Sequence, residues 1–86
     1  MNYDQLLVNR IKQLCKRKVC SINKLSTISG VKQSTLDNIM RGITKNPGII
    51  SIHKIANAFN MTLAEFLDFD ELNDYSFDDN DEDCED

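Results

Sequence analysis

Residues 21–42 read SINKLSTISGVKQSTLDNIMRG, and this stretch decides the fold. Ser21 is a good N-cap, and apolar side chains follow it at helical spacing until Gly30 interrupts the pattern. Gly30 fits the position after a helix where the backbone turns left-handed. A second helical pattern covers residues 33–40 and stops before Gly42. Two short helices joined by a glycine-containing turn are typical of a helix-turn-helix, whose second helix can enter the major groove of DNA.

Three more helices are predicted around this pair, so we expect an all-α fold with five helices. The pairs Asn2 with Gln5 and Thr62 with Glu65 are capping boxes that open the first and the fifth helix. The expected bounds of the first four helices are about 3–18, 22–29, 33–40 with Arg41 at the end, and 49 or 51 to 59. Residues 61–65 open the fifth helix. The expected core is Leu7, Ile11, Leu14, Cys15, Leu25, Val31, Leu36, Ile39, Met40, Ile52, Ile55, Ala56, Phe59, Leu63, Phe66 and Leu67.

The composition limits the class of protein. Eighty-six residues allow one small domain, and there is no run of about 18 apolar residues that would span a membrane. The first residues lack the basic and apolar regions of a signal peptide, so we expect a cytoplasmic protein. Cys15, Cys20 and Cys84 are an odd set and no disulfide framework. We interpret the first two as core or near-core residues and Cys84 as the freely reactive thiol.

Charge is segregated along the chain. Residues 1–69 hold all ten Lys and Arg against four Asp and Glu, a net charge of +6. Residues 70–86 hold ten acids and no base, a net charge of −10. A basic globular part joined to an acidic segment indicates a nucleic-acid partner, although the net charge of the chain is −4.

Residues 70–86 are too acidic and too poor in apolar side chains to bury much surface, so we predict a domain over 1–69 and a disordered acidic tail. Three roles for this tail stay open at this point. It can keep the protein soluble, it can mimic DNA and dock on the basic face, or it can bind a protein partner.

The outward face of the second motif helix carries the candidate base contacts. Gln33 and Asn38 have the paired donor and acceptor that read an adenine edge, and Ser34 can pair with several bases. A solvated surface helix alone would explain such side chains. Their position on the second helix of a helix-turn-helix favours base contact.

A set of residues spread over all five predicted helices carries a family resemblance. They are Ile11, Leu14, Leu25-Ser26, Ser29-Gly30-Val31, Gln33-Ser34-Thr35-Leu36, Ile39, Arg41-Gly42, Asn46-Pro47, Ile52, Lys54-Ile55-Ala56, Ala58-Phe59, Thr62-Leu63 and Phe66-Leu67. In this order, over about residues 6–68, the chain resembles the Xre family of small transcriptional regulators, the Cro and lambda-repressor-like helix-turn-helix domains.

The resemblance implies a compact five-helix lambda-repressor-like domain that binds double-stranded DNA, usually as a homodimer on a palindromic operator. Base contacts are expected from Gln33, Ser34 and Asn38. Contacts with the DNA backbone are expected from Ser21, Lys32, Thr35, Arg41, Thr44 and Lys45.

The chain departs from the family pattern in three ways. Lys32 stands where a capping Ser or Thr is common, which weakens the cap by about 1 kcal/mol but offers a cation to a phosphate. Cys15 and Met40 stand where many members have a paired Arg and Glu, so an apolar pair replaces an ion pair. Ile22 replaces a Gln that often contacts DNA.

We therefore predict a sequence-specific DNA-binding transcriptional regulator, a repressor, that reads the major groove with the helix at about 33–41. The alternative is an antitoxin-like module whose main partner is another protein. The sequence contains no nucleophile–base pair, metal cluster or phosphate-binding glycine loop, so no enzyme activity, cofactor or metal is expected. His53, the one histidine, is interpreted as an ordinary surface residue.

Overall fold

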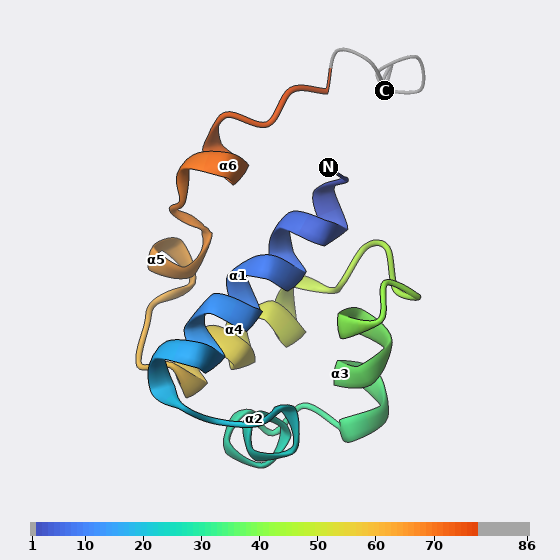
Figure 1. The fold of residues 1–86 in the computed structure, drawn as a ribbon, viewed down its shortest axis with the longest axis vertical. Coiled ribbons are helices and arrows are strands. Elements are labelled where there is room, and N and C mark those ends of the chain that lie inside the picture. The colour runs from blue at the N-terminus through green and yellow to red at the C-terminus, as the bar shows by residue number, and fades with distance from the viewer. Residues whose placement is uncertain (1, 78–86) are drawn as a thin grey trace.

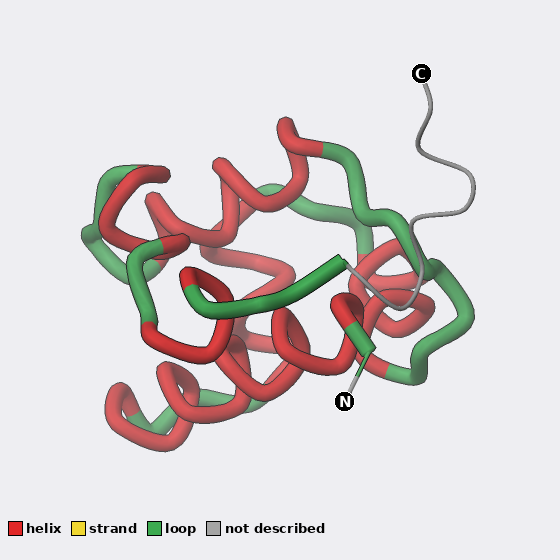
Figure 2. The backbone as a smooth tube through the Cα atoms, turned by 90° about the horizontal axis from the view of Figure 1, so that it is seen from above, coloured by secondary structure: helices red, strands yellow, loops and turns green. Residues whose placement is uncertain are grey.

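Helix α1 (Tyr3–Lys18) is the longest element and crosses the front of the molecule, with α4 behind it (Figure 1). The structure is a computed structural model that describes residues 2–77. The helices that follow are α2 (Ile22–Ser29), α3 (Gln33–Met40), α4 (Ile49–Ala58), α5 (Leu63–Leu67) and α6 (Asp70–Asn73). Over residues 2–77 every regular element is a helix (Figure 2), which confirms the all-α class. No helix in this part of the chain is long and apolar enough to cross a bilayer.

The first five helices lie where the sequence predicts them, with one difference. Helix α4 ends at Ala58, and Phe59 is its C-cap rather than its last residue. Side chains at the N-caps explain several starts. The Ser21 hydroxyl accepts from the Lys24 N–H at 3.1 Å at the start of α2, whereas Lys32 makes no side-chain capping bond at the start of α3, as predicted. The predicted capping box of α5 is present.

The core is shared by the helices α1 to α5. Its largest fully buried side chains are Ile11, Leu25, Leu36, Ile39, Ile55 and Phe66, all of them predicted. Full burial of such a side chain contributes about 1.5–3 kcal/mol. Leu6 and Val8 are also buried, beyond the predicted stripe, because α1 contacts α3 on one side and α6 on another.

Residues 70–77 differ from the prediction of a disordered tail that begins at residue 70. They contain the short helix α6, and Leu72 packs against the core. The Tyr75 ring meets the Tyr3 ring edge to face with centroids 5.2 Å apart, and the Phe77 ring stacks on Tyr3 at 5.8 Å. The apolar residues of this segment are too few to order it by themselves, but α1 supplies their packing partners. The rest of the predicted tail, 78–86, lies outside the described residues.

Candidate nucleic-acid interface

The turn between α2 and α3 is held by hydrogen bonds from two serines. Gly30 has the left-handed φ of 81° that the sequence predicts, and its N–H donates to the Ser26 carbonyl at 3.0 Å. The Ser26 hydroxyl donates to the Val31 carbonyl at 2.6 Å, and the Ser29 hydroxyl accepts from the Val31 N–H at 3.1 Å. The sequence does not predict these two hydrogen bonds, because a serine in the last turn of a helix is no specific signal. These bonds fix the angle between the two motif helices.

Helix α3 has one buried and one exposed face. Leu36 and Ile39 are 0% and 1% exposed and anchor the helix in the core. Gln33, Ser34 and Asn38 are exposed, so the structure brings the three predicted base-reading side chains together on the outer surface. An anchored helix with a polar outer face has the form of a recognition helix.

The first turn of α3 is a favourable place for an anion. Its leading N–H groups have no partner within the helix, and the N-cap side chain of Lys32 does not cover them. Gln33 Nε2 donates to Asp37 Oδ1 at 3.1 Å, so one of its two amide donors is already used inside the helix. The arrangement can accept a phosphate at the helix end while the outer face meets a groove.

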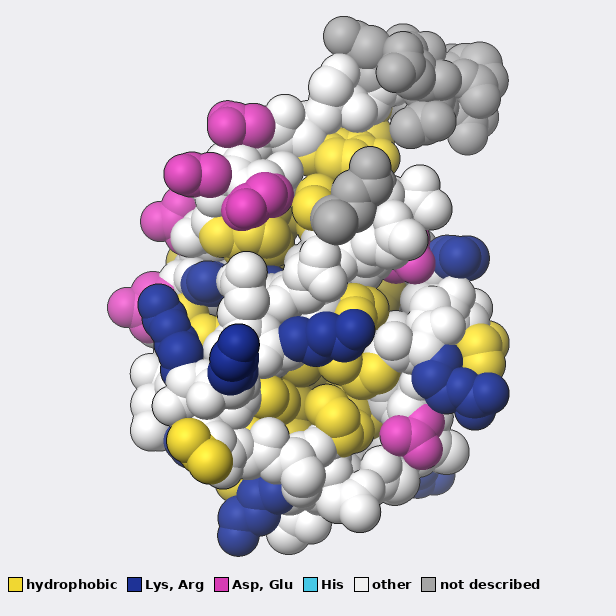
Figure 3. Space-filling model, in the orientation of Figure 1, with side chains coloured by type: hydrophobic (Ala, Val, Ile, Leu, Met, Phe, Trp, Pro, Cys, Tyr) yellow, Lys and Arg dark blue, Asp and Glu magenta, His cyan; other side chains and the backbone are white. Residues whose placement is uncertain are grey.

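The six predicted contacts with the DNA backbone lie within the helix-turn-helix or in the loop that follows it. Four of them are exposed, namely Ser21, Lys32, Arg41 and Lys45, and two are half-buried, namely Thr35 and Thr44. The loop after α3 folds back on the helix, because the Thr44 N–H donates to the Asn38 carbonyl at 3.1 Å. Acidic side chains gather instead over α5 and α6 (Figure 3). Their place leaves the surroundings of α2 and α3 predominantly neutral or basic.

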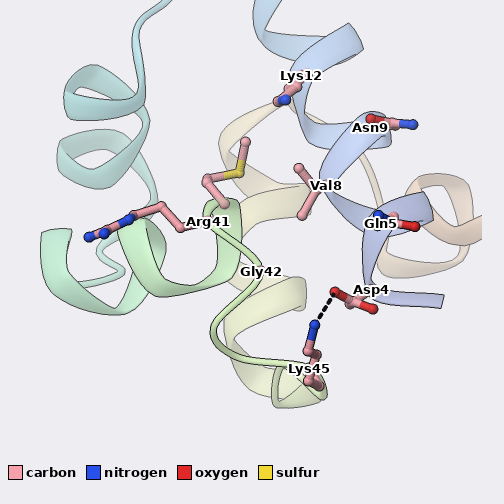
Figure 4. Close-up of a pocket in the computed structure, with 9 residues that line it drawn as sticks. Asp4, Gln5, Val8, Asn9, Lys12, Arg41, Gly42 and Lys45 are labelled. Carbon is pink, nitrogen blue, oxygen red and sulfur yellow. Dashed lines mark ion pairs between the residues drawn. The ribbon is translucent and has the colours of Figure 1, made fainter. Parts of the chain in front are cut away.

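Lys45 also contacts the fold, which the sequence did not show. Its ammonium lies 3.8 Å from the carboxylate of Asp4, a residue that is only 6% exposed (Figure 4). Asp4 lies in the first turn of α1, where the helix dipole favours a negative charge. Both residues line a cavity of about 360 Å³ between α1 and the end of α3. Arg41 lines it too, but in Figure 4 its side chain points away from the ion pair.

Two cations of α1 have structural partners. Arg10 donates from Nε to the Phe66 carbonyl at 2.9 Å and from Nη2 to the Glu65 carbonyl at 3.0 Å. Lys18 donates from Nζ to the Ala58 carbonyl at 3.1 Å. These two side chains are therefore tied to the fold by hydrogen bonds and are not simply hydrated. They satisfy carbonyls at the ends of α5 and α4.

Three of the four positions that depart from the family pattern, all except Lys32, line one cavity. Cys15 is buried and Met40 is half-buried, and both line a cavity of about 710 Å³ with Ile22. Figure 3 shows hydrophobic side chains gathered in the middle of one face of the molecule, between α1 and the motif helices. An apolar pocket thus occupies the place where the family pattern would put an ion pair. Residues 2–77 contain no group of three His, Cys, Asp or Glu side chains that could hold a metal ion.

The fold and the exposed face of α3 define a helix-turn-helix DNA-binding domain. The chain belongs to the Cro/C1-type HTH DNA-binding domain family, whose model matches residues 10–71. The family is a class of DNA-binding domain and not of enzyme. This confirms the resemblance found in the sequence.

A relative and a solved structure agree with this family. The HTH-type transcriptional regulator SlrR of Bacillus subtilis (strain 168) is 38% identical over 63 residues, which are 72% of this chain and 41% of that protein. The chain thus spans about two fifths of that relative's length. The crystal structure of the prophage Lp1 protein 11 superposes with a TM-score of 0.77 at 25% identity, over 87% of this chain and 100% of that one.

Proposed function

We propose that the chain represses transcription by binding a specific DNA sequence with α3 in the major groove. The observation that carries the proposal is the exposed cluster of Gln33, Ser34 and Asn38 on the second motif helix, whose other face is buried. The DNA-binding family and the similarity to a transcriptional regulator support it. They do not favour the alternative of an antitoxin-like module.

In this proposal the three side chains read base edges, with adenine as the natural partner of Gln33 and Asn38. The exposed and half-buried groups around α3 hold the phosphates and set the register of the helix in the groove. These phosphate contacts are Ser21, Lys32, Thr35, Arg41, Thr44 and Lys45.

We further propose that the protein binds a palindromic operator as a homodimer and acts in the cytoplasm. A two-fold symmetric dimer places two α3 helices one turn of DNA apart, so half-sites separated by about 10 bp are expected. A protein partner for the acidic residues beyond Phe77 is a second expectation, and it is independent of the DNA contacts.

The test begins with selection of bound duplexes from a random pool at moderate salt. Replacing Gln33 by Ala should then cost about 1–3 kcal/mol on the selected site and relax the preference at one base pair. Gln13→Ala is the matched control, because Gln13 is an exposed glutamine on α1, away from the motif. If no duplex is enriched, or Gln33→Ala keeps the same site preference in competition, the assignment of α3 as the reading helix is wrong.

A further inference from the structure

Cys15 and Cys20 occupy two positions that a helix C-terminal motif brings into contact. Helix α1 ends in a left-handed residue, Val19, with φ 55°. The Cys20 N–H donates to the Cys15 carbonyl at 3.0 Å, and the Val19 N–H donates to the Lys16 carbonyl at 3.3 Å. These two bonds define a Schellman motif, in which the side chains at the Cys15 and Cys20 positions typically touch.

The backbone geometry of this pair permits a disulfide. A 3.0 Å hydrogen bond from the Cys20 N–H to the Cys15 carbonyl keeps their Cα atoms no more than about 7 Å apart, given standard bond lengths. Disulfides span Cα separations up to nearly that value. Burial, and then the hydrogen bond and charge of the neighbouring Cys20 thiol, raise the pKa of Cys15 to about 11, so Cys15 stays protonated at neutral pH and is not the first thiol to react.

The pair is accessible from one side. Cys15 is buried and Cys20 is half-buried, and both line the cavity of about 710 Å³ described above. Lys12 and Lys16 line the same cavity, so its rim attracts anionic reagents. A small peptide disulfide that carries carboxylates, such as oxidised glutathione, fits this chemistry.

We propose that Cys15 and Cys20 are a site of oxidative modification. A low-molecular-weight disulfide oxidises the two thiols to a Cys15–Cys20 disulfide, and this bond weakens DNA binding. The more exposed Cys20 reacts first as its thiolate, attacks one sulfur of the reagent and releases one thiol. Cys15 then loses its proton and attacks the Cys20 sulfur, which releases the second thiol. Two protein thiols are oxidised, and the reagent is reduced to two thiols.

The effect on DNA follows from the place of the pair and rests on the proposed function. Cys20 directly precedes Ser21, which caps α2 and is a proposed phosphate contact. A covalent bond draws the two sulfurs to about 2 Å and pulls this corner toward α1. Met40 of α3 lines the same cavity as the two cysteines, so a shift of this corner also reaches the proposed recognition helix.

The experiment uses full-length protein with Cys84→Ser, which removes the thiol outside the described residues. The folded protein is equilibrated with oxidised glutathione, and its mass and linked peptides are measured. We expect the loss of two hydrogen atoms, a Cys15–Cys20 link, and reversal by dithiothreitol. Cys15→Ala in the same background should stop at a glutathione adduct on Cys20. Protein that stays reduced, or that keeps a stable adduct on Cys20 with both cysteines present, would overturn the proposal.

The second measurement compares the oxidised and reduced forms on the selected duplex. We expect several-fold weaker binding by the oxidised form, restored by dithiothreitol, and no response when Cys20→Ala is combined with Cys84→Ser. Equal affinity of the two forms would overturn the effect on DNA. Failure of the reduced form to bind any duplex would instead refute the proposed function, and it would leave the result of the mass measurement standing.

Discussion

The cationic side chains of this chain form two groups, one bound to the protein backbone and one without an ion-pair partner among the described residues. Arg10 and Lys18 on α1 donate to backbone carbonyls at the ends of α5 and α4. Lys32 and Arg41 flank α3 and make no ion pair within residues 2–77. The net charge of +6 over residues 1–69 therefore overstates the charge that DNA can meet. Residue type alone does not separate a cation of the fold from a cation of the interface.

The difference has a structural cause. Helix α5 has only five residues, so it cannot satisfy its terminal carbonyls from within. Arg10 supplies donors from α1, and its guanidinium lies 5.0 Å from the centre of the Phe69 ring and 5.9 Å from that of Phe66. Lys32 and Arg41 have no ion-pair partner in the part of the chain that the structure describes. If they bind phosphate as proposed, their contribution should depend on salt.

The largest expected effect is on Arg10. Arg10→Met should lower the free energy of unfolding by roughly 2–3 kcal/mol, because it removes two charged hydrogen bonds and the contacts with the aromatic rings. Urea denaturation measures this loss, and binding per folded molecule should not change. Arg17→Met, on the exposed side of the same helix, should stay within about 0.5 kcal/mol of the parent. Equal losses of stability for both variants would contradict the conclusion that Arg10 stabilises the fold and Arg17 does not.

The second prediction concerns the acidic residues beyond the described part. Truncation after Phe77 removes seven Asp and Glu and keeps α6. If these acids compete with phosphate for the interface, the truncated protein should bind random duplex about tenfold more tightly at low salt. The gain should be smaller on the selected site and should shrink as salt increases.

The choice of end point matters for this experiment. Truncation after Asp68 would also remove Phe69, α6 and the rings of Tyr75 and Phe77 that pack on Tyr3, so it would mix stability with charge. Binding of the two forms is compared across a salt series with specific and random duplexes. Identical affinities at low salt would show that the acids do not restrain DNA binding.

The third prediction concerns Val19, where a substitution should change the stability of the fold without changing its charge. Val19 has φ 55° and is 88% exposed, so its branched side chain is strained and packs little. Val19→Gly should stabilise the fold by about 1 kcal/mol, measured by thermal unfolding, and leave the salt slope of DNA binding unchanged. Gly30→Ala is the converse control, because φ there is 81° and the substitution should destabilise. A loss of stability in Val19→Gly would contradict the assignment of strain.

The smallest effect is expected at Lys45, which shares features with both groups because it forms an ion pair within the fold and is also exposed near α3. Its side chain is 71% exposed, so loss of the Asp4 ion pair in Lys45→Ala should cost no more than about 0.5 kcal/mol. Binding to all sequences should weaken alike, and the salt slope should fall by about 1. Lys54→Ala on α4 is the exposed control and should change neither quantity. A large loss of stability with an unchanged slope would place Lys45 with the cations of the fold.

Much of the fold was determined by the sequence itself, because its signals are local. Helix caps, the left-handed Gly30 and apolar spacing act over three or four residues, so they can be predicted directly from the sequence. The exposed face of α3 also follows from spacing, and the structure places its three polar residues as expected. Which bases and phosphates they meet remains a prediction.

Only the tertiary structure decided the features that join distant segments. The Phe66 carbonyl that Arg10 binds lies 56 residues further along the chain, and no local pattern marks that pair. The segment at 70–77 was misjudged because its own apolar residues are few, whereas the surface that orders it belongs to α1. Local signals determine which residues form helices. Burial depends instead on which surfaces pack together, and the local sequence of a segment does not show which distant segment it packs against.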